Sequence, residues 1–175
     1  MQKESAASRI QANIQELFKG KLAPGEPHIK FQLTPEITAL LSMEQVQASL
    51  IVPAEKITAL PGMPESIIGI MNSRDRVLCV YDLAHLLNLP TTLTASQQYQ
   101  IVILEISQLS SSEQKLPVGL AVEQIGGITR LARENFQQPS NVPECLTSHV
   151  LASVGDSEQQ FVLDMATISA TITTK

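Results

Sequence analysis

Histidine and cysteine side chains are the first candidates for chemistry in this chain. The three histidines, His28, His85 and His149, lie dozens of residues apart, and their spacing matches no zinc-binding motif. Cys145 and His149 stand four residues apart, a spacing that brings a thiol and an imidazole together only on a helix. Pro143 disfavours a helix there. The pattern therefore predicts neither a metal site nor a Cys/His nucleophile.

The carboxylates are the remaining candidates, because two of them could form an acid–base pair. Their flanking residues are typical of strand ends and helix caps, and Asp82 is interpreted as the cap of a short helix. The sequence contains no GxGxxG, no phosphate-binding loop ending in GK[ST], no HExxH and no CxxC. We therefore expect no active site, no metal and no cofactor. The carboxylates considered are Asp75, Asp82, Glu105, Glu123 and Asp164.

Length and composition point to one globular domain held by an aliphatic core. The chain has 175 residues, 43% of them hydrophobic and 17% charged, and aromatic residues make up only 3%. A formal net charge of −5, with dispersed Lys and Arg, argues against a nucleic-acid partner. Two distant cysteines and no long apolar run favour a cytoplasmic protein without a membrane-inserted segment.

The elements that must position any site are predicted to be mostly strands. Alternating apolar and polar residues indicate strands over residues 28–34, 44–52, 99–106, 116–128 and 160–165. Two apolar runs, 67–71 and 77–81, are joined by the polar turn formers of residues 72–75, which predicts a hairpin. Gly126-Gly127 indicates a bulge, and a Thr/Ile/Ala tail closes the chain. Short strands with frequent turns favour a barrel or sandwich.

The N-terminal segment has a different pattern. Apolar residues at Ile10, Ile14, Leu17 and Phe18 have the spacing of one helix face, which predicts a helix over residues 5–18. We divide the chain into residues 1–27, a helix with its linker, and residues 28–175, the main domain. Such a short helix needs a docking surface. That surface is either the barrel of the same molecule or a groove on another protein.

A family resemblance lies in the predicted hairpin. The run Gly69-Ile70-Met71-Asn72-Ser73-Arg74-Asp75, followed by an apolar strand ending in Asp82-Leu83, resembles the central signature of CheW-like domains, with its Asn-x-Arg-Gly turn. Val118-Gly119-Leu120-Ala121-Val122-Glu123-Gln124-Ile125 is similar to the family's Gly-x-x-Val-Asp-x-Val strand, and Phe161-Val162-Leu163-Asp164 to its closing strand. The resemblance covers about residues 29–170.

The resemblance implies a mainly β fold with short helices. In this fold two five-stranded SH3-like barrels share one hydrophobic core. It implies a non-enzymatic adaptor between the cytoplasmic tip of a chemoreceptor and the regulatory domain of a CheA-like histidine kinase. The partner-binding residues that it implies are Asn72, Arg74, Asp75, Val46, Gln47 and Ala48.

Three departures from the family pattern mark a divergent member. Asp75 replaces the usual Gly, Cys79 replaces a usual Pro, and Ala48 replaces a frequent acidic residue. These changes favour the kind of member attached to type IV pilus or phototaxis signalling. An alternative is a CheW-like module that binds a response regulator or a pilus-motor component, through the N-terminal helix.

Overall fold

The structure is a computed structural model that describes residues 24–107, 114–155 and 159–174. The helix predicted over residues 5–18 lies outside these residues. Strands make up most of the described chain, and the α-helices are short. The elements are β1 (Glu26–Gln32), β2 (Thr38–Ser42), β3 (Val46–Pro53), β4 (Ile67–Ser73), β5 (Arg76–Asp82), α2 (Leu83–Leu86), β6 (Gln98–Ser107), β7 (Lys115–Val122), β8 (Gln124–Leu131), β9 (Phe136–Gln137), β10 (Val150–Val154), β11 (Gln160–Leu163) and α3 (Met165–Thr174), with 3-10 turns at Ala54–Lys56, Arg133–Asn135 and Glu144–Leu146.

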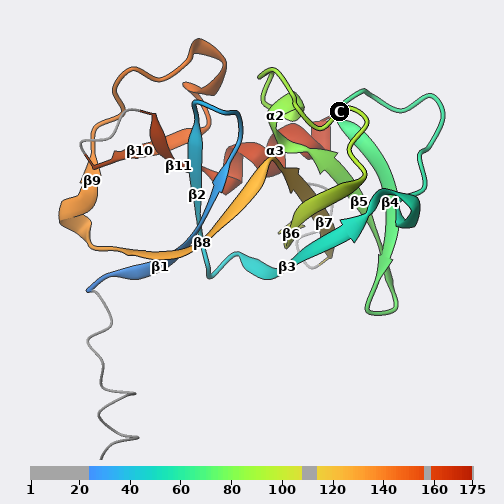
Figure 1. Cartoon of the computed structure of the whole chain (residues 1–175). Helices are drawn as coiled ribbons and strands as arrows, with labels where there is room; N and C mark the ends of the chain where they lie inside the picture. The colour runs from blue at the N-terminus through green and yellow to red at the C-terminus, as the bar shows by residue number, and fades with distance from the viewer. Residues whose placement is uncertain (1–23, 108–113, 156–158, 175) are drawn as a thin grey trace, which may run out of the picture.

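The strands form two curled sheets that lie side by side (Figure 1). One has six strands in the order β8-β1-β2-β11-β10-β9, and the other has five in the order β3-β6-β7-β5-β4. From β1 the described chain forms two strands of the six-stranded sheet, then the whole five-stranded sheet from β3 to β7, and then returns to the six-stranded sheet. The five-stranded sheet curls far enough for Thr58, which follows β3, to bridge to Ile70 of β4. The expected mainly β, two-barrel fold is confirmed, with six strands rather than five in one sheet.

Both sheets contribute to one hydrophobic core. Ile29 and Phe31 of the six-stranded sheet belong to the same buried cluster as Val102 and Leu104 of the five-stranded sheet. The predicted shared core is therefore present. Each sheet also curls around a smaller cluster of its own. The inner cluster of the five-stranded sheet has nine buried residues, whereas that of the six-stranded sheet has four, among the residues described.

The predicted hairpin is β4–β5, and its turn is tighter than expected. The strands pair from Ile67↔Tyr81 to Ser73↔Arg76, so only Arg74 and Asp75 form the connection. Both residues have positive φ, 47° and 62°, as a two-residue hairpin turn of this hand requires. Asp tolerates this backbone region better than most residues. The family's usual Gly can therefore be replaced here.

Two further local predictions are confirmed. The side chain of Asp82 accepts a hydrogen bond from the backbone N–H of His85, so it caps α2 as expected. Lys30 pairs with Gly127 and Phe31 with Ile125, which leaves Gly126 as the extra residue of a bulge between β1 and β8.

The strand predicted over residues 116–128 is wrong as a single element. It breaks at Glu123, where β7 leaves the five-stranded sheet and β8 joins the six-stranded one. The backbone N–H of Glu123 bonds to the carbonyl of Gln32, and that of Ile125 bonds to the side chain of Gln100. These hydrogen bonds to both sheets fix the backbone where the chain passes from β7 to β8. The apolar periodicity of the sequence does not reveal them.

Strands β2, β9 and β10 and helix α3 were not predicted. In β2, Ala39 and Leu41 face the shared core while Leu40 faces the inner cluster of its own sheet, so the strand shows no alternation. Helix α3 lies in the Thr-rich tail, whose β-branched residues are poor helix formers. Burial of Ile168 and Ile172 on one face outweighs this weak propensity.

Candidate partner-binding surface

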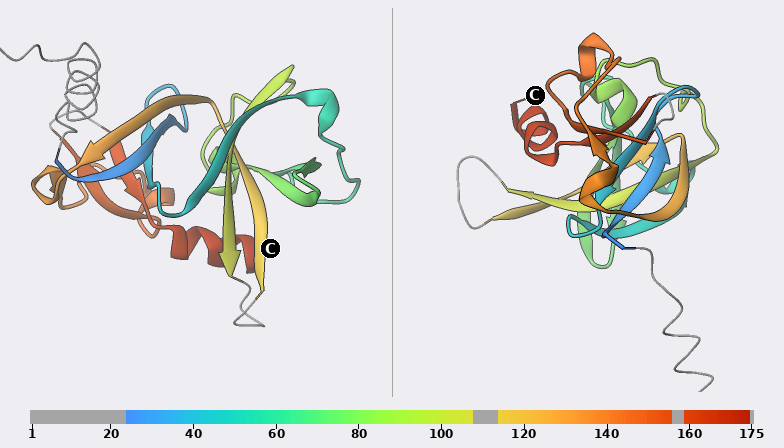
Figure 2. Two further views of the ribbon diagram at one scale, coloured as in Figure 1. Left: turned by 90° about the horizontal axis from the view of Figure 1, so that it is seen from below. Right: turned by 90° about the vertical axis from the view of Figure 1, so that its left-hand side faces the viewer.

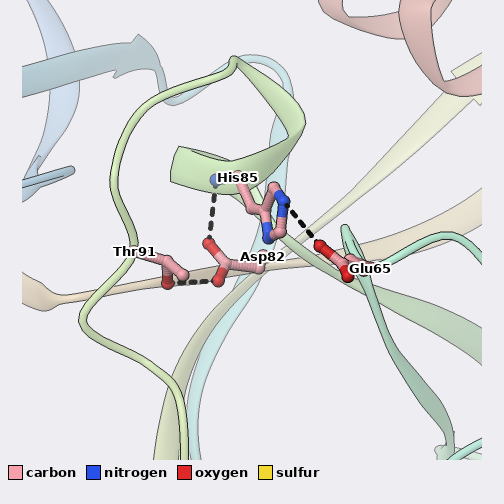
Figure 3. A network of polar contacts seen from close by, with 4 residues as sticks. All are labelled: Glu65, Asp82, His85 and Thr91. Atoms are coloured by element: carbon pink, nitrogen blue, oxygen red, sulfur yellow. Dashed lines mark hydrogen bonds and ion pairs between the residues drawn. The ribbon is translucent and has the colours of Figure 1, made fainter.

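The buried carboxylate of Asp82 has a structural role (Figure 3). One oxygen caps α2 at 3.1 Å from the N–H of His85, and the other accepts a hydrogen bond from the hydroxyl of Thr91. Thr91 in turn accepts a bond from the N–H of Leu93, whose side chain completes the inner cluster of the five-stranded sheet. The imidazole of His85 lies 3.6 Å from Glu65. Asp82 therefore ties a loop to the barrel, and both of its oxygens are occupied.

Cys145 and His149 share no α-helix, because Cys145 lies in the 3-10 turn Glu144–Leu146 and His149 follows that turn. Cys79 and Tyr81 are further groups that could act as nucleophiles only when deprotonated. Burial raises the pKa of the Cys79 thiol, which keeps it protonated, and raises the pKa of Tyr81 to about 12. Nδ1 of His149 lies 3.0 Å from the hydroxyl of Thr167. Burial lowers the pKa of this imidazole, and the nearby Asp164 opposes that effect. Within the described ranges, no three His, Cys, Asp or Glu residues lie close enough to hold a metal ion.

The predicted partner-binding residues divide into two groups in space. Gln47, Ala48 and Arg74 line one hollow of about 220 Å³ at the end of the five-stranded sheet. Its floor is the inner cluster of that sheet, to which two of its lining residues belong. Two guanidinium groups stand at this hollow, so we call it the cationic hollow. Its lining is Gln47, Ala48, Ser73, Arg74, Arg76, Leu78, Ile103 and Pro117.

The other predicted residues lie elsewhere. Val46 is half-buried against the shared core, and Asp75 is exposed at the tip of the turn. Asn72 lines a separate depression with Lys56 and Val77. The structure therefore brings together three of the six residues, and Arg74 is the charged one among them.

A bulge in β3 explains how two consecutive residues reach the same hollow. Val46 pairs with Leu104 and Ala48 with Ile103, so Gln47 is an extra residue in the strand. In a regular strand, neighbouring side chains point to opposite faces. The bulge breaks that alternation and re-aims the side chain of Gln47.

An ion pair that sequence reasoning missed borders the cationic hollow. Nη1 of Arg76 lies 2.7 Å from Oε1 of Glu105, across the sheet on β6. Hydrogen bonds from Arg76 and from the Gln47 amide lower the pKa of the Glu105 carboxyl. An exposed ion pair adds little stability. Its effect here is to hold Arg76 and Glu105 in fixed orientations, leaving Arg74 as the hollow's guanidinium with no partner among the described residues.

A second groove starts on the other side of this ion pair. Helix α3 lies across the end of β6, as the left view of Figure 2 shows, and the space between them is about 400 Å³. We call it the helix groove. Glu105 lines it, so the ion pair separates the helix groove from the cationic hollow. Its apolar lining is Leu104, Ile106, Met165, Ala166 and Ala170.

Comparison with known proteins agrees with this architecture. The model of the CheW-like domain family matches residues 29–172, which is most of the chain. The chain belongs to the CheW-like domain family. Among solved structures, the scaffolding protein TtCheW from Thermoanaerobacter tengcongensis is similar, with a TM-score of 0.63 and 22% sequence identity over 81% of this chain and 90% of that one. At this identity the likeness shows the fold. A search of curated proteins found no significant match.

The helix groove of this CheW-like domain was not predicted, because α3 was not predicted. The signal that could have indicated α3 is the set Met165, Ile168 and Ile172, whose spacing fits one face of a helix. The Arg76–Glu105 pair joins residues far apart in the chain, so predicting it would have required knowing the order of the strands in the sheet.

No helix within the described residues is long and apolar enough to cross a membrane.

Proposed function

We propose that this protein is a non-enzymatic cytoplasmic adaptor that couples the tip of a chemoreceptor to the regulatory domain of a CheA-type histidine kinase. Membership of the CheW-like family supports the role of coupling scaffold. The observation that carries the receptor half of the proposal is the cationic hollow with its neighbouring helix groove. Together they present apolar surface framed by fixed charges.

The receptor tip is proposed to bind as a helix laid along these two depressions. Helix-in-groove recognition needs an apolar floor for the helix face and polar groups at its edges. Leu78 and Ile103 lie at the floor of the cationic hollow, and Ala166 and Ala170, which are exposed on α3, supply apolar surface in the helix groove. Arg74 would clasp a carboxylate of the receptor, since its planar fork matches carboxylate geometry.

The kinase requires a second surface, because an adaptor must hold both partners at once. The residues of β7 that resemble the family strand, such as Val118 and Leu120, are fully buried and cannot contact a partner. Ile128 is 64% exposed on β8, an edge strand of the six-stranded sheet, and we assign the kinase contact to its surroundings. The departures at Asp75, Cys79 and Ala48 favour a pilus or phototaxis signalling system as the setting.

Two charge substitutions test the receptor half. We expect Arg74→Glu to weaken binding of a receptor-tip fragment by about tenfold or more, with an unchanged thermal unfolding curve, because Arg74 is exposed. Arg133→Glu is the matched control, since it reverses an exposed charge beside the six-stranded sheet. Titration calorimetry measures the binding of both variants, and thermal unfolding measures their stability. Equal binding by wild type and Arg74→Glu, or early unfolding of the variant, would refute the assignment.

A second pair tests the kinase half. Ile128→Glu should weaken binding of the kinase regulatory domain and leave receptor binding intact. Ile51→Glu alters an equally exposed side chain on β3 of the other sheet and should preserve kinase binding. Capture of a response regulator or a pilus-motor component without the kinase would favour the alternative module instead.

A further inference from the structure

The six-stranded sheet ends in a hollow of its own, with the opposite charge. This hollow is about 410 Å³ in volume. The carboxylates of Glu26 and Asp164 line it, and no Lys or Arg is among its lining residues. We call it the anionic hollow. Its apolar lining is Phe136, Leu151, Ala152, Val162, Leu163 and Met165.

The apolar floor of the anionic hollow is incompletely covered. Leu151 is 60% exposed there, although it is a large aliphatic side chain in strand β10. Beneath it lies the smallest of the three buried clusters, which consists of Leu40, Leu131, Val154 and Val162 and is extended by Phe136. Covering Leu151 would remove more apolar surface from water, which favours an occupant with an apolar face.

The chain's own N-terminal segment enters the structure at this hollow. Glu26, the first residue of β1, lines it. Just before it, Gly25 has a φ of 116° and lies against Leu131, whose carbonyl carbon would be 2.2 Å from an added Cβ. The point where residues 1–23 join the barrel is therefore held closely. Seven residues, 19–25, separate Phe18 from Glu26 and span at most roughly 25 Å.

Residues 10–18 have the chemistry that this hollow requires. Their apolar stripe, Ile10, Ile14, Leu17 and Phe18, suits the uncovered floor. The segment of residues 1–23 is basic, although the whole chain has a formal net charge of −5. It carries Lys3, Arg9, Lys19 and Lys21 against Glu4 and Glu16.

We propose that residues 10–18 form a helix that covers the anionic hollow of the same molecule. Leu17 and Phe18, nearest to β1 in the chain, pack against Leu151 and Phe136. The flanking basic residues face Glu26 and Asp164. This inference does not depend on the receptor or the kinase, because it concerns the chain alone.

Hydrogen exchange on the purified full-length protein tests the proposal. In the wild type, amides of residues 10–18 should exchange at least about tenfold more slowly than those of a free peptide of the same sequence, because docking stabilises the helix. Leu151→Glu places a charge on the floor of the hollow and should remove this protection. Ile128→Glu is the matched control, since Ile128 is similarly exposed on the same sheet but outside the hollow, and should retain it.

Three results would overturn the proposal. The first is exchange of residues 10–18 at the free-peptide rate in the wild type. The second is full protection in Leu151→Glu. The third is protection that disappears on dilution below the micromolar range, which would show docking onto a second molecule rather than the same one. Neither the receptor nor the kinase is present, so failure here leaves the coupling role untouched.

Discussion

The two sheets of this CheW-like domain differ in how well each fills its own interior. The five-stranded sheet encloses nine buried residues of the described chain, including Leu93 from a loop, and has hollows of about 220 and 390 Å³. The six-stranded sheet encloses four and has a hollow of about 410 Å³. Arginines line the cationic hollow and carboxylates line the anionic hollow. The five-stranded sheet therefore fills its interior with more of its own side chains than the six-stranded sheet does, and the charges at their hollows are opposite.

The largest effect should come from truncating the two inner clusters. Ile101→Ala removes a fully buried side chain from the five-stranded sheet's cluster and should lower the free energy of unfolding by about 4 kcal/mol. Leu40→Ala in the other cluster should cost about 2–3 kcal/mol, because the site beside the anionic hollow can relax. Urea unfolding measures both. Equal losses, or a larger loss for Leu40→Ala, would show that the five-stranded sheet's cluster is not the better packed of the two.

A methyl group added to a glycine should also destabilise the two sheets to different extents. A Cβ at Gly119 would lie 2.9 Å from Ile101 and 3.0 Å from Leu78, inside the filled cluster. Gly119→Ala should therefore cost about 1–3 kcal/mol through overpacking. Gly126→Ala in the bulge of the six-stranded sheet meets nothing closer than 3.4 Å and should be better tolerated. Thermal unfolding compares the two, and a neutral Gly119→Ala would show that the cluster is less well filled than described.

Two aspartates offer a smaller contrast. Asp82 is buried and binds both the N–H of His85 and the hydroxyl of Thr91 in the five-stranded half. Asp164 accepts one bond from the N–H of Ala166 at the start of α3. Asp82→Ala should cost about 1–2 kcal/mol and Asp164→Ala about half as much. Denaturant midpoints decide the order, and a larger loss for Asp164→Ala would contradict it.

The smallest effect should be a difference in acid sensitivity. Burial lowers the pKa of His149 below 6.5, so below that pH the unfolded chain takes up a proton that the native state refuses. This contribution is complete above pH 6.5 and is lost as the pH falls towards the folded pKa. The lowered pKa of Glu105 affects the free energy of unfolding only below about pH 4.5, the ordinary pKa of a glutamate side chain. His149→Gln should flatten the stability profile in the upper window, and an unchanged slope would exclude His149 as the cause.

The sequence was sufficient where the signal is local. The turn residues around Arg74 and Asp75 predicted the hairpin, Asp82 predicted a cap, and paired glycines predicted a bulge. Each of these features depends on backbone preferences of a few neighbouring residues. The family resemblance then supplied the two-barrel arrangement, which no periodicity predicts.

The elements and contacts that the sequence analysis missed depend on residues that are distant in the chain and neighbours in space. Strand β2 has apolar residues on both faces because each face packs on a different cluster. Helix α3 forms because Ile168 and Ile172 find a core, despite a sequence rich in β-branched residues. The Arg76–Glu105 pair and the bulge at Gln47 depend on the pairing of β3 with β6. Half of the predicted site therefore fell outside the hollow that the strands assemble.

We propose that one molecule of this protein holds a receptor and a kinase at the same time. The most direct test is size-exclusion chromatography with light scattering on the full-length protein, a chemoreceptor-tip fragment and a CheA-type regulatory domain. We expect the three to elute as one complex, and the receptor and kinase fragments to elute separately when the protein is left out. Binding of only one partner, or displacement of one by the other, would contradict the coupling role.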